Sequence, residues 1–236
     1  MTPHSIPEDT PKGSQFYITK VPATIRRHMS YFQELRSGMF KKLTGKTILI
    51  TGVSSGIGRS TAIEFGRASP QSLRLILTAR RLEVLREVAA EINSEVGDGV
   101  KILTAQLDVS KLEEIDGDIE RLRDEWRAID ELVNNALVSP LSQKLILESL
   151  DISTANMNIM FATNVIGLIN MTQAILPTML RLNKGDIIKL NRIAGHEAYP
   201  GGSIYCAAKS AVRSCSDAPK RELIRTRIRV IEIGPG

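Results

Sequence analysis

Tyr205 and Lys209, near the end of the chain, are candidates for acid–base chemistry. On a helix, their i, i+4 spacing places both side chains on one face. A free tyrosine has a pKa of about 10 and is a poor acid or base at neutral pH, but a neighbouring cation favours the phenolate and lowers that pKa. The pair therefore suits proton transfer. The same spacing also occurs by chance on many helix surfaces, so the surrounding elements must decide between the two interpretations.

From Thr47 onward, short apolar runs alternate with longer amphipathic segments. The predicted strands are Thr47–Thr51, Leu73–Thr78, Val100–Leu107, Glu131–Asn134, Asp186–Leu190 and Arg229–Ile233. The predicted helices are Ile57–Ala68, Leu82–Asn93, Leu112–Arg127, Ile152–Leu182 and Ser203–Thr226. The strands are nearly continuous runs of Ile, Leu and Val, which is typical of a parallel sheet with helices on both faces. No linker interrupts the alternation, so we predict a single α/β, doubly wound (Rossmann) domain over residues 45–236.

A glycine-rich turn follows the first predicted strand, in the run Thr51-Gly52-Val53-Ser54-Ser55-Gly56-Ile57-Gly58. Glycines let the backbone turn tightly and approach a pyrophosphate, while the next helix offers unpaired N–H groups and the positive end of its dipole. Spaced glycines alone are weak evidence, but their position between an apolar strand and an amphipathic helix predicts a dinucleotide site. The alternative, a flexible Gly/Ser loop, fits this position poorly.

The second predicted strand ends in Thr78-Ala79-Arg80-Arg81. At this point of a dinucleotide site, an acidic residue would bond the ribose hydroxyls of NAD, whereas arginine accommodates the 2′-phosphate of NADP. Two guanidinium groups suit a phosphate dianion, so Arg80 and Arg81 predict NADP as the cofactor. The alternative is that both arginines only begin a solvated helix.

Residues 1–44 differ in composition from the rest of the chain. Met1–Gly13 is rich in proline and polar residues, and Val21–Leu43 is basic with apolar residues near helical spacing. We predict a poorly ordered extension. A basic helix lying on a membrane or on the domain is one alternative. Mitochondrial targeting is another, although Glu8 and Asp9 stand where transit peptides avoid acids.

The overall composition is that of an ordinary globular protein. Cys206 and Cys215 imply no disulfide framework, which favours a reducing compartment and a cytoplasmic location. No apolar stretch is expected to reach the ~20 residues of a membrane span. The net charge of +5 permits anionic ligands such as nucleotides, but no aromatic interleaving points to nucleic acid. No metal site is predicted.

Several ordered motifs resemble the classical short-chain dehydrogenases/reductases. Besides the glycine-rich turn, they are Leu107-Asp108-Val109, Asn134-Asn135-Ala136, Thr163-Asn164-Val165, Tyr205 with Lys209, and Ile233-Gly234-Pro235-Gly236. The likeness covers roughly Lys42 to the C-terminus. Ala79-Arg80-Arg81 and the stretch Asp186–Ala208 look most like the microbial NADP-dependent 3-hydroxy acid (serine) dehydrogenases.

The resemblance implies a role for each matching residue. It would place the pyrophosphate against Gly52, Ser54, Ser55, Gly56, Ile57 and Gly58. Asp108 would contact the adenine ring, while Asn135 and Ala136 would line the adenosine side of the cleft. The Pro235-Gly236 turn would also contact the cofactor.

The resemblance also implies a reaction. Tyr205 would exchange a proton with the substrate oxygen, Lys209 would hold the nicotinamide ribose and lower the tyrosine pKa, and Asn164 would anchor a water of the proton relay. A hydride would pass between the nicotinamide and a small, 3-hydroxy acid-like secondary alcohol or its ketone.

Departures from the family pattern lie near the chemistry. Arg192 stands thirteen residues before Tyr205, where the family has a serine, and Asn191 replaces a small residue. Leu137 replaces a glycine. Losing a donor such as the serine typically lowers the rate by about a hundred- to a thousand-fold.

Other departures concern assembly and the end of the chain. Pro219 interrupts the helix of Tyr205, which commonly forms the dimer interface in this family, so we expect a kink and a disturbed homo-oligomer. Family members continue past the Pro-Gly turn with a substrate-covering segment and one more strand, so the domain is expected to be truncated after its sixth strand. Three hypotheses follow: an active NADP-dependent oxidoreductase, a catalytically impaired NADP(H)-binding homologue, and a gene product that does not fold stably.

Overall fold

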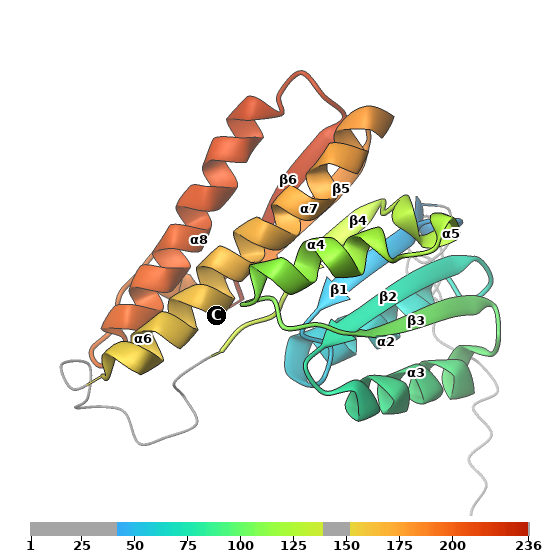
Figure 1. Ribbon diagram of the computed structural model, residues 1–236, viewed down its shortest axis with the longest axis horizontal. Helices are drawn as coiled ribbons and strands as arrows, with labels where there is room; N and C mark the ends of the chain where they lie inside the picture. Colours follow the sequence, from blue (N-terminus) through green and yellow to red (C-terminus); the bar gives the residue numbers. More distant parts are fainter. Residues whose placement is uncertain (1–41, 139–151, 236) are drawn as a thin grey trace, which may run out of the picture. The chain divides into compact units, whose positions relative to one another are not determined.

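The computed structural model describes residues 42–138 and 152–235. Within them, a six-stranded parallel sheet has the order β3-β2-β1-β4-β5-β6 (Figure 1). Its strands are β1 (Thr47–Thr51), β2 (Leu73–Ala79), β3 (Val100–Gln106), β4 (Glu131–Asn134), β5 (Gly185–Leu190) and β6 (Ile228–Ile233). The order reverses between β1 and β4, and in doubly wound sheets ligands bind at the carboxyl ends of the strands beside such a reversal. The predicted α/β Rossmann fold is confirmed.

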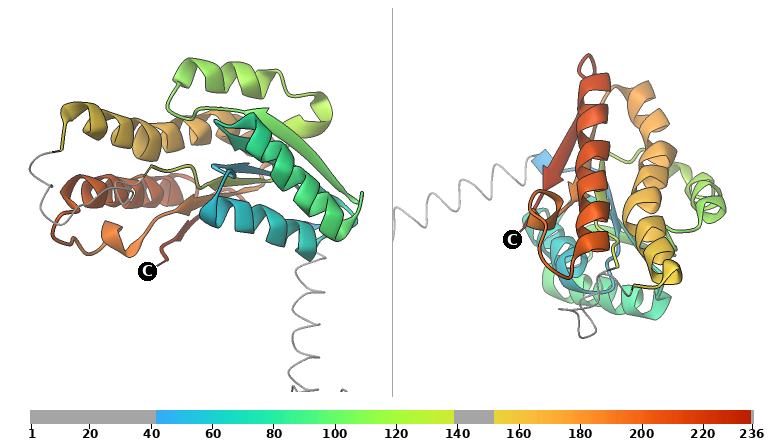
Figure 2. Two further views of the ribbon diagram at one scale, coloured as in Figure 1. Left: turned by 90° about the horizontal axis from the view of Figure 1, so that it is seen from below. Right: turned by 90° about the vertical axis from the view of Figure 1, so that its left-hand side faces the viewer.

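Helices cover both faces of this sheet (Figures 1 and 2). One face carries α2 (Gly56–Ala68) and α3 (Leu82–Val96), and the other carries α4 (Leu112–Glu120), α7 (Gly167–Leu182) and α8 (Ser203–Glu222). Alternate residues of β1 serve opposite faces: Ile48 and Ile50 belong to the α2/α3 core, and Leu49 to the α4/α7 core. All three are fully buried, which explains why β1 is a continuous apolar run.

The predicted strands agree closely with the observed ones. β1 and β4 have the predicted bounds, and the other four strands differ by one residue at one end. The predicted helix Leu112–Arg127 is instead two helices, α4 and α5 (Asp124–Arg127). Arg123 is extended between them, and the Arg127 guanidinium donates to the carbonyls of Leu122 and Glu120, so side-chain bonds replace helical ones at the break.

The predicted helix Ile152–Leu182 contains a π-helical turn. It runs as α6 (Thr154–Phe161), η2 (Ala162–Ile166) and α7. At the start of α7, a Cβ on Gly167 would lie 2.5 Å from the Val109 carbonyl oxygen, so glycine permits the close approach of this helix to the loop after β3. Single π-helical turns within α-helices, such as η2, often occur at functional sites.

The same stretch corrects the expectation about membrane spans. Thr154–Leu182 is the one helix in the described part of the chain with the length and apolar composition of a span. Its side chains Met171, Ile175 and Met179 are at most 2% exposed and pack against the sheet. It is therefore a core helix, and its apolar composition reflects burial in protein.

The helix α8 continues past Pro219 to Glu222. Proline has no N–H to donate to the carbonyl four residues earlier, at Cys215. That carbonyl accepts a hydrogen bond of 2.6 Å from Nζ of Lys189, a β5 residue that is 2% exposed. Because Pro219 cannot bond the Cys215 carbonyl, that carbonyl is available to accept from the buried ammonium group of Lys189.

Several predictions fall outside the described residues. These are the structure of residues 1–41 and the cofactor contact of Gly236. Leu43, at the edge of the predicted extension, packs in the α2/α3 core. The boundary between residues 44 and 45 stays a prediction.

Candidate active site

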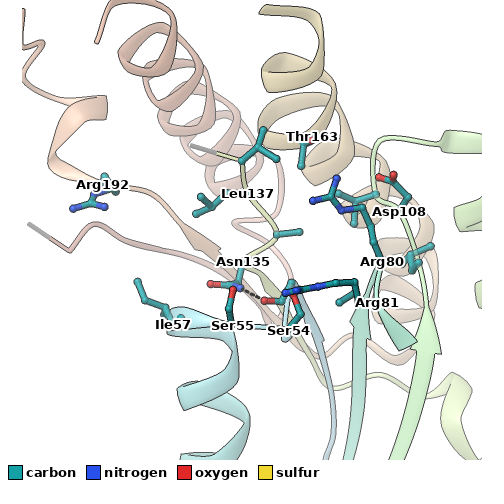
Figure 3. A pocket seen from close by; sticks show the side chains of 17 residues that line it. Ser54, Ser55, Ile57, Arg80, Arg81, Asp108, Asn135, Leu137, Thr163 and Arg192 are labelled. Carbon is teal, nitrogen blue, oxygen red and sulfur yellow. Dashed lines mark hydrogen bonds between the residues drawn. The ribbon is translucent and has the colours of Figure 1, made fainter. Parts of the chain in front are cut away.

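A cleft of about 580 Å³ opens at the carboxyl ends of the strands, where their order reverses (Figure 3). Its floor is the glycine-rich turn between β1 and α2. Arg80 and Arg81 follow β2 on one side, and Arg192 follows β5 on the opposite side. The cleft is large enough and polar enough for a small-molecule ligand.

The turn needs two of its glycines for packing inside the protein. Gly52 has φ +72°, and a Cβ there would lie 2.7 Å from the Ala136 Cα. A Cβ on Gly58 would lie 2.3 Å from Nδ2 of Asn135. The Asn135 amide in turn donates to the carbonyls of Thr51 and Gly52 at 2.9 and 3.1 Å. Asn135 therefore holds the turn in place, because its amide nitrogen is engaged with the backbone.

Gly56 faces the cleft in a different way. It has φ +58°, yet a Cβ there would meet nothing within 4 Å. Ser55 precedes α2, and its side chain makes no capping hydrogen bond to the first turn of that helix. The turn thus combines open space with helix N–H groups that its own cap leaves unsatisfied, and this cradle fits a pyrophosphate.

The two arginines after β2 complete the fit to a phosphorylated dinucleotide. Both are exposed, and in the described part of the chain neither guanidinium has an ion pair or a hydrogen bond. Asp108 also lines the cleft, and its Oδ1 accepts from the Ser110 amide and hydroxyl at 3.1 and 2.8 Å. Two unpaired cations at this end suit a phosphate dianion.

Asn164 lies in the π-helical turn and binds the backbone after β4. Its Oδ1 accepts from the Val138 amide, and its Nδ2 donates to the Val138 carbonyl, both at 2.8 Å. The side chain is 3% exposed. Asn164 therefore joins the long helix to the segment that carries Ala136 and Leu137 along the cleft.

Tyr205 and Lys209 lie together on α8, as their spacing predicts. Nζ of Lys209 lies 5.8 Å from the centroid of the Tyr205 ring and donates to the Leu190 carbonyl at 3.0 Å. The two residues are 2% and 1% exposed. Among the described residues, no hydrogen bond of ordinary geometry reaches the buried Tyr205 hydroxyl, but the Arg192 side chain lies close enough to act on its pKa.

The charges around the pair differ from the expected arrangement. Burial raises the pKa of Tyr205 above its ordinary value, and the cation that opposes this rise is Arg192. Burial also lowers the pKa of Lys209 to about 8, with Arg192 adding to the decrease. Burial and Arg192 are the main influences on the Tyr205 pKa in this structure, and a lowering by Lys209 stays a prediction. Lys209 sits in an environment that disfavours its own charge.

Arg192 occupies the position of the family's serine and lines the cleft. It precedes the short 3₁₀ helix η3 (Ile193–Gly195), which packs against α8. Glu232 of β6 accepts from Asn191 Nδ2 at 2.8 Å, lies 3.5 Å from His196 Nε2, and raises the pKa of Lys209. The Glu232 carboxylate thus lies close to basic residues near Tyr205.

The cleft brings together many of the predicted cofactor residues. Those that line it are Gly52, Ser54, Ser55, Gly56, Ile57, Arg80, Arg81, Asp108, Asn135 and Ala136. Gly58, Asn164, Tyr205, Lys209 and Pro235 lie outside the lining formed by the described residues. Pro235 accepts a hydrogen bond from the Ile193 amide at 3.3 Å, so it adjoins the Arg192 side.

Some lining residues had no sequence prediction as ligand contacts. They are Ala79, Leu107, Val109, Leu137, Val138 and Thr163. Most of them directly adjoin a predicted motif or strand end, so their position at the carboxyl edge of the sheet was the available signal.

Comparisons with known proteins identify the family of this chain. The family model for short chain dehydrogenase matches residues 46–236. The NADP-dependent 3-hydroxy acid dehydrogenase of Schizosaccharomyces pombe is 45% identical over 195 residues, which cover 83% of this chain and 72% of that protein. Sulfoacetaldehyde reductase 2 of Chromohalobacter salexigens is 36% identical over 190 residues, 80% of this chain and 71% of that protein. A closed form of serine dehydrogenase complexed with NADP⁺ superposes with a TM-score of 0.70 at 35% identity, covering 80% of this chain and 71% of that one.

The fold, the glycine-rich turn and these matches establish the family: the chain belongs to the short-chain dehydrogenases. Within the family it is most similar to NADP-dependent 3-hydroxy acid dehydrogenases.

Proposed function

We propose that this protein is an NADP-dependent oxidoreductase that interconverts a small, anionic 3-hydroxy acid and its ketone or aldehyde. One observation carries the proposal. A single cleft has Arg80 and Arg81 at one end, without an ion pair among residues 42–138 and 152–235, and Arg192 at the other end. It therefore offers cations for a phosphorylated ribose and for an acidic substrate. The NADP-dependent relatives named above support the cofactor.

The cofactor supplies hydride chemistry when it is bound. The residues of the chain do the remaining work. Arg80 and Arg81 bind the 2′-phosphate, and the turn from Gly52 to Gly58 binds the pyrophosphate. Asp108 lies beside the adenine, and Asn135 and Asn164 hold the backbone that lines the cleft.

Tyr205 exchanges the proton with the substrate oxygen. Its raised pKa keeps the hydroxyl protonated at neutral pH, so it is poised as an acid toward a carbonyl. Lys209 lies beside it and binds the nicotinamide ribose. Arg192 stands where the family has a serine hydroxyl, and its guanidinium binds either the reacting oxygen or the acidic group of the substrate.

A specific observation favours a second candidate, an NADP(H)-binding homologue with impaired turnover. In this structure Arg192 lines the cleft, whereas Tyr205 and Lys209 are buried outside its lining. An arginine is also much larger than the serine it replaces. On this alternative the chain binds NADPH but Arg192 keeps substrate away from the tyrosine.

One set of variants separates the two candidates. NADPH binding is titrated by its fluorescence, and NADP-linked oxidation of serine and of small 3-hydroxy acids is assayed. The proteins are the unmodified chain, Arg192→Ser, Tyr205→Phe and the double variant. An active enzyme turns over and loses about a hundredfold or more of its rate in Tyr205→Phe. An impaired homologue binds NADPH equally well but gains turnover only in Arg192→Ser. Failure of all four proteins to bind NADPH would contradict both candidates.

Three further predictions remain proposals. They are the domain boundary near residue 45, the cytoplasmic location and the disturbed homo-oligomer. The match to the family model begins at residue 46, which supports the boundary.

A further inference from the structure

A basic surface with protruding apolar side chains lies at the end of the sheet opposite the cleft. It comprises residues 180–184, at the end of α7, and residues 221–227, which connect α8 to β6; we call it the α7/α8 end. The cleft is built from residues that follow strands, whereas residues 221–227 immediately precede β6. A partner on this surface would therefore leave the cleft open.

The two segments are joined by a hydrogen bond. The Arg227 amide donates to Oδ1 of Asn183 at 3.1 Å. Asn183 ends α7 in the left-handed region, with φ 48°, which turns the chain so that its side chain faces the other segment. Figures 1 and 2 show the ends of α7 and α8 at the same end of the domain. The surface is thus formed by two segments that are far apart in the sequence.

Apolar side chains protrude from this surface. Ile224 is 79% exposed, and Leu182 and Leu180 are 47% and 45% exposed. Of the large apolar side chains described as exposed, Ile224 has the highest exposed fraction. A lone exposed leucine needs no explanation, but protruding apolar residues in a basic rim indicate an interaction surface.

The rim is strongly cationic. The two segments contain five cations, Arg181, Lys184, Arg221, Arg225 and Arg227, and one acid, Glu222. Lys184 pairs with Asp130 at 2.7 Å. In the described part of the chain, Arg221, Arg225 and Arg227 have no side-chain ion pair.

Two exposed arginines on α2 and α3 provide a contrast, because both form ion pairs. Arg59 pairs with Glu91 at 2.6 Å, and Arg86 with Glu83 at 2.6 Å. The α7/α8 end therefore retains a positive charge that acids neutralise around Arg59 and Arg86, and it is complementary to an anionic partner.

From these contacts and charges, we propose that the α7/α8 end binds the surface of a membrane that contains anionic phospholipids. The arginines approach the headgroup phosphates, and Ile224 inserts at the level of the headgroups. Each basic residue near such a surface contributes attraction, and an inserted apolar side chain adds a second signal. The two segments contain no aromatic side chain on which a nucleic-acid base could stack, which favours lipid over nucleic acid.

The test is co-sedimentation of the full chain with vesicles. One set contains phosphatidylcholine alone, and the other contains equal amounts of phosphatidylcholine and phosphatidylserine. We expect binding to the second set alone, and loss of binding at high salt. Arg225→Glu with Arg227→Glu should lower the partition coefficient by about thirtyfold or more, because each cation contributes about a fivefold factor. Ile224→Ser should lower it by a smaller factor, about threefold to tenfold.

A matched control carries the same charge change on the opposite edge of the sheet. Arg86→Glu with Lys101→Glu alters two exposed cations of α3 and β3, and should bind vesicles as the unmodified chain does. All variants should bind NADPH normally, which confirms that they fold.

Three outcomes would overturn the proposal. Equal loss in the control pair would show a general charge effect, and unchanged binding in Arg225→Glu with Arg227→Glu would place lipid binding elsewhere, such as in the basic residues 21–43. A single-stranded oligonucleotide that binds the unmodified chain and displaces it from vesicles, with the same dependence on Arg225 and Arg227, would identify a nucleic-acid site instead.

Discussion

The two halves of the candidate active site differ in the exposure and the partners of their polar side chains. In the nucleotide half, Arg80 and Arg81 are exposed at the cleft without an ion pair in the described residues. In the half that carries Tyr205, the polar groups are buried or partly buried and contact protein groups: Lys209 donates to the Leu190 carbonyl, and Asn191 donates to Glu232.

This difference means that only one of the two halves is open to a ligand in this structure. The nucleotide half is an open cradle whose geometry is held by backbone contacts. The other half places cations close together around a buried tyrosine, so desolvation and repulsion dominate there. The variants below probe each half, in order of decreasing expected effect.

The largest effect is expected in the cradle, from Gly52→Ala. The substitution combines a left-handed φ of +72° with a Cβ 2.7 Å from the Ala136 backbone. We expect the free energy of unfolding to fall by about 2–5 kcal/mol, as measured by urea denaturation without cofactor. Gly56→Ala is the matched control, since it has φ +58° but open space, and should lose only about 1–2 kcal/mol. Equal losses would mean that the Ala136 contact is not tight.

A smaller effect is expected from the arginine pair. Arg80→Ala with Arg81→Ala should raise the Kd for NADPH by about a hundredfold, because two charge-assisted hydrogen bonds to phosphate are lost. The Kd for NADH should change little. Fluorescence titration measures both values, and Arg86→Ala, on the helix α3 that follows the arginine pair, serves as the control. A parallel loss of NADH affinity would show that the arginines only support the fold.

The buried lysine should make stability depend on pH. The pKa of Lys209 is about 8 in the folded protein and 10.5 when unperturbed, so between these values the unfolded chain binds more protons. Stability should therefore rise with pH from about 8 to 10, by at most about 1.4 kcal/mol per pH unit. Above pH 10, the raised pKa of Tyr205 acts in the opposite direction, since the folded state then keeps its proton longer.

The substitution Lys209→Met should remove the part of the pH dependence that arises from the lowered pKa of Lys209. The variant's stability should be flatter than that of the unmodified chain between pH 8 and 10, as followed by thermal melts at each pH. A slope that survives the substitution would assign the dependence to another group.

The smallest effect concerns Pro219. Replacing an interior helix proline by alanine ordinarily stabilises a helix by about 3 kcal/mol. Here the Cys215 carbonyl already accepts from Lys189, so Pro219→Ala should gain about 1 kcal/mol or less. In a Lys189→Met background the same change should gain about 1 kcal/mol more, because the carbonyl then lacks a partner. Additive effects in urea denaturation would contradict this coupling.

Much of the fold could be predicted because its signals are local. The apolar runs of β1 and β4 gave their bounds directly, since strands buried on both faces are continuous apolar segments. The break between α4 and α5 could not be predicted, because it depends on hydrogen bonds from the Arg127 guanidinium to the carbonyls of Leu122 and Glu120. A helix over Ile152–Leu182 was predicted, but the length of its apolar stretch was underestimated; burial against the sheet, which depends on the tertiary structure, explains that apolar composition.

The family, the Rossmann fold and many of the residues that line the cleft could be predicted from the sequence alone. Glycine spacing and the arginines after β2 act through short stretches of backbone, so their pattern is readable along the chain. The tertiary structure alone decided what the polar side chains do. It engaged Asn135 and Asn164 with backbone groups, buried Tyr205 beside Arg192, and joined residues 183 and 227 into one basic surface. Burial and charge at these places arise from contacts between distant segments, which no local pattern records.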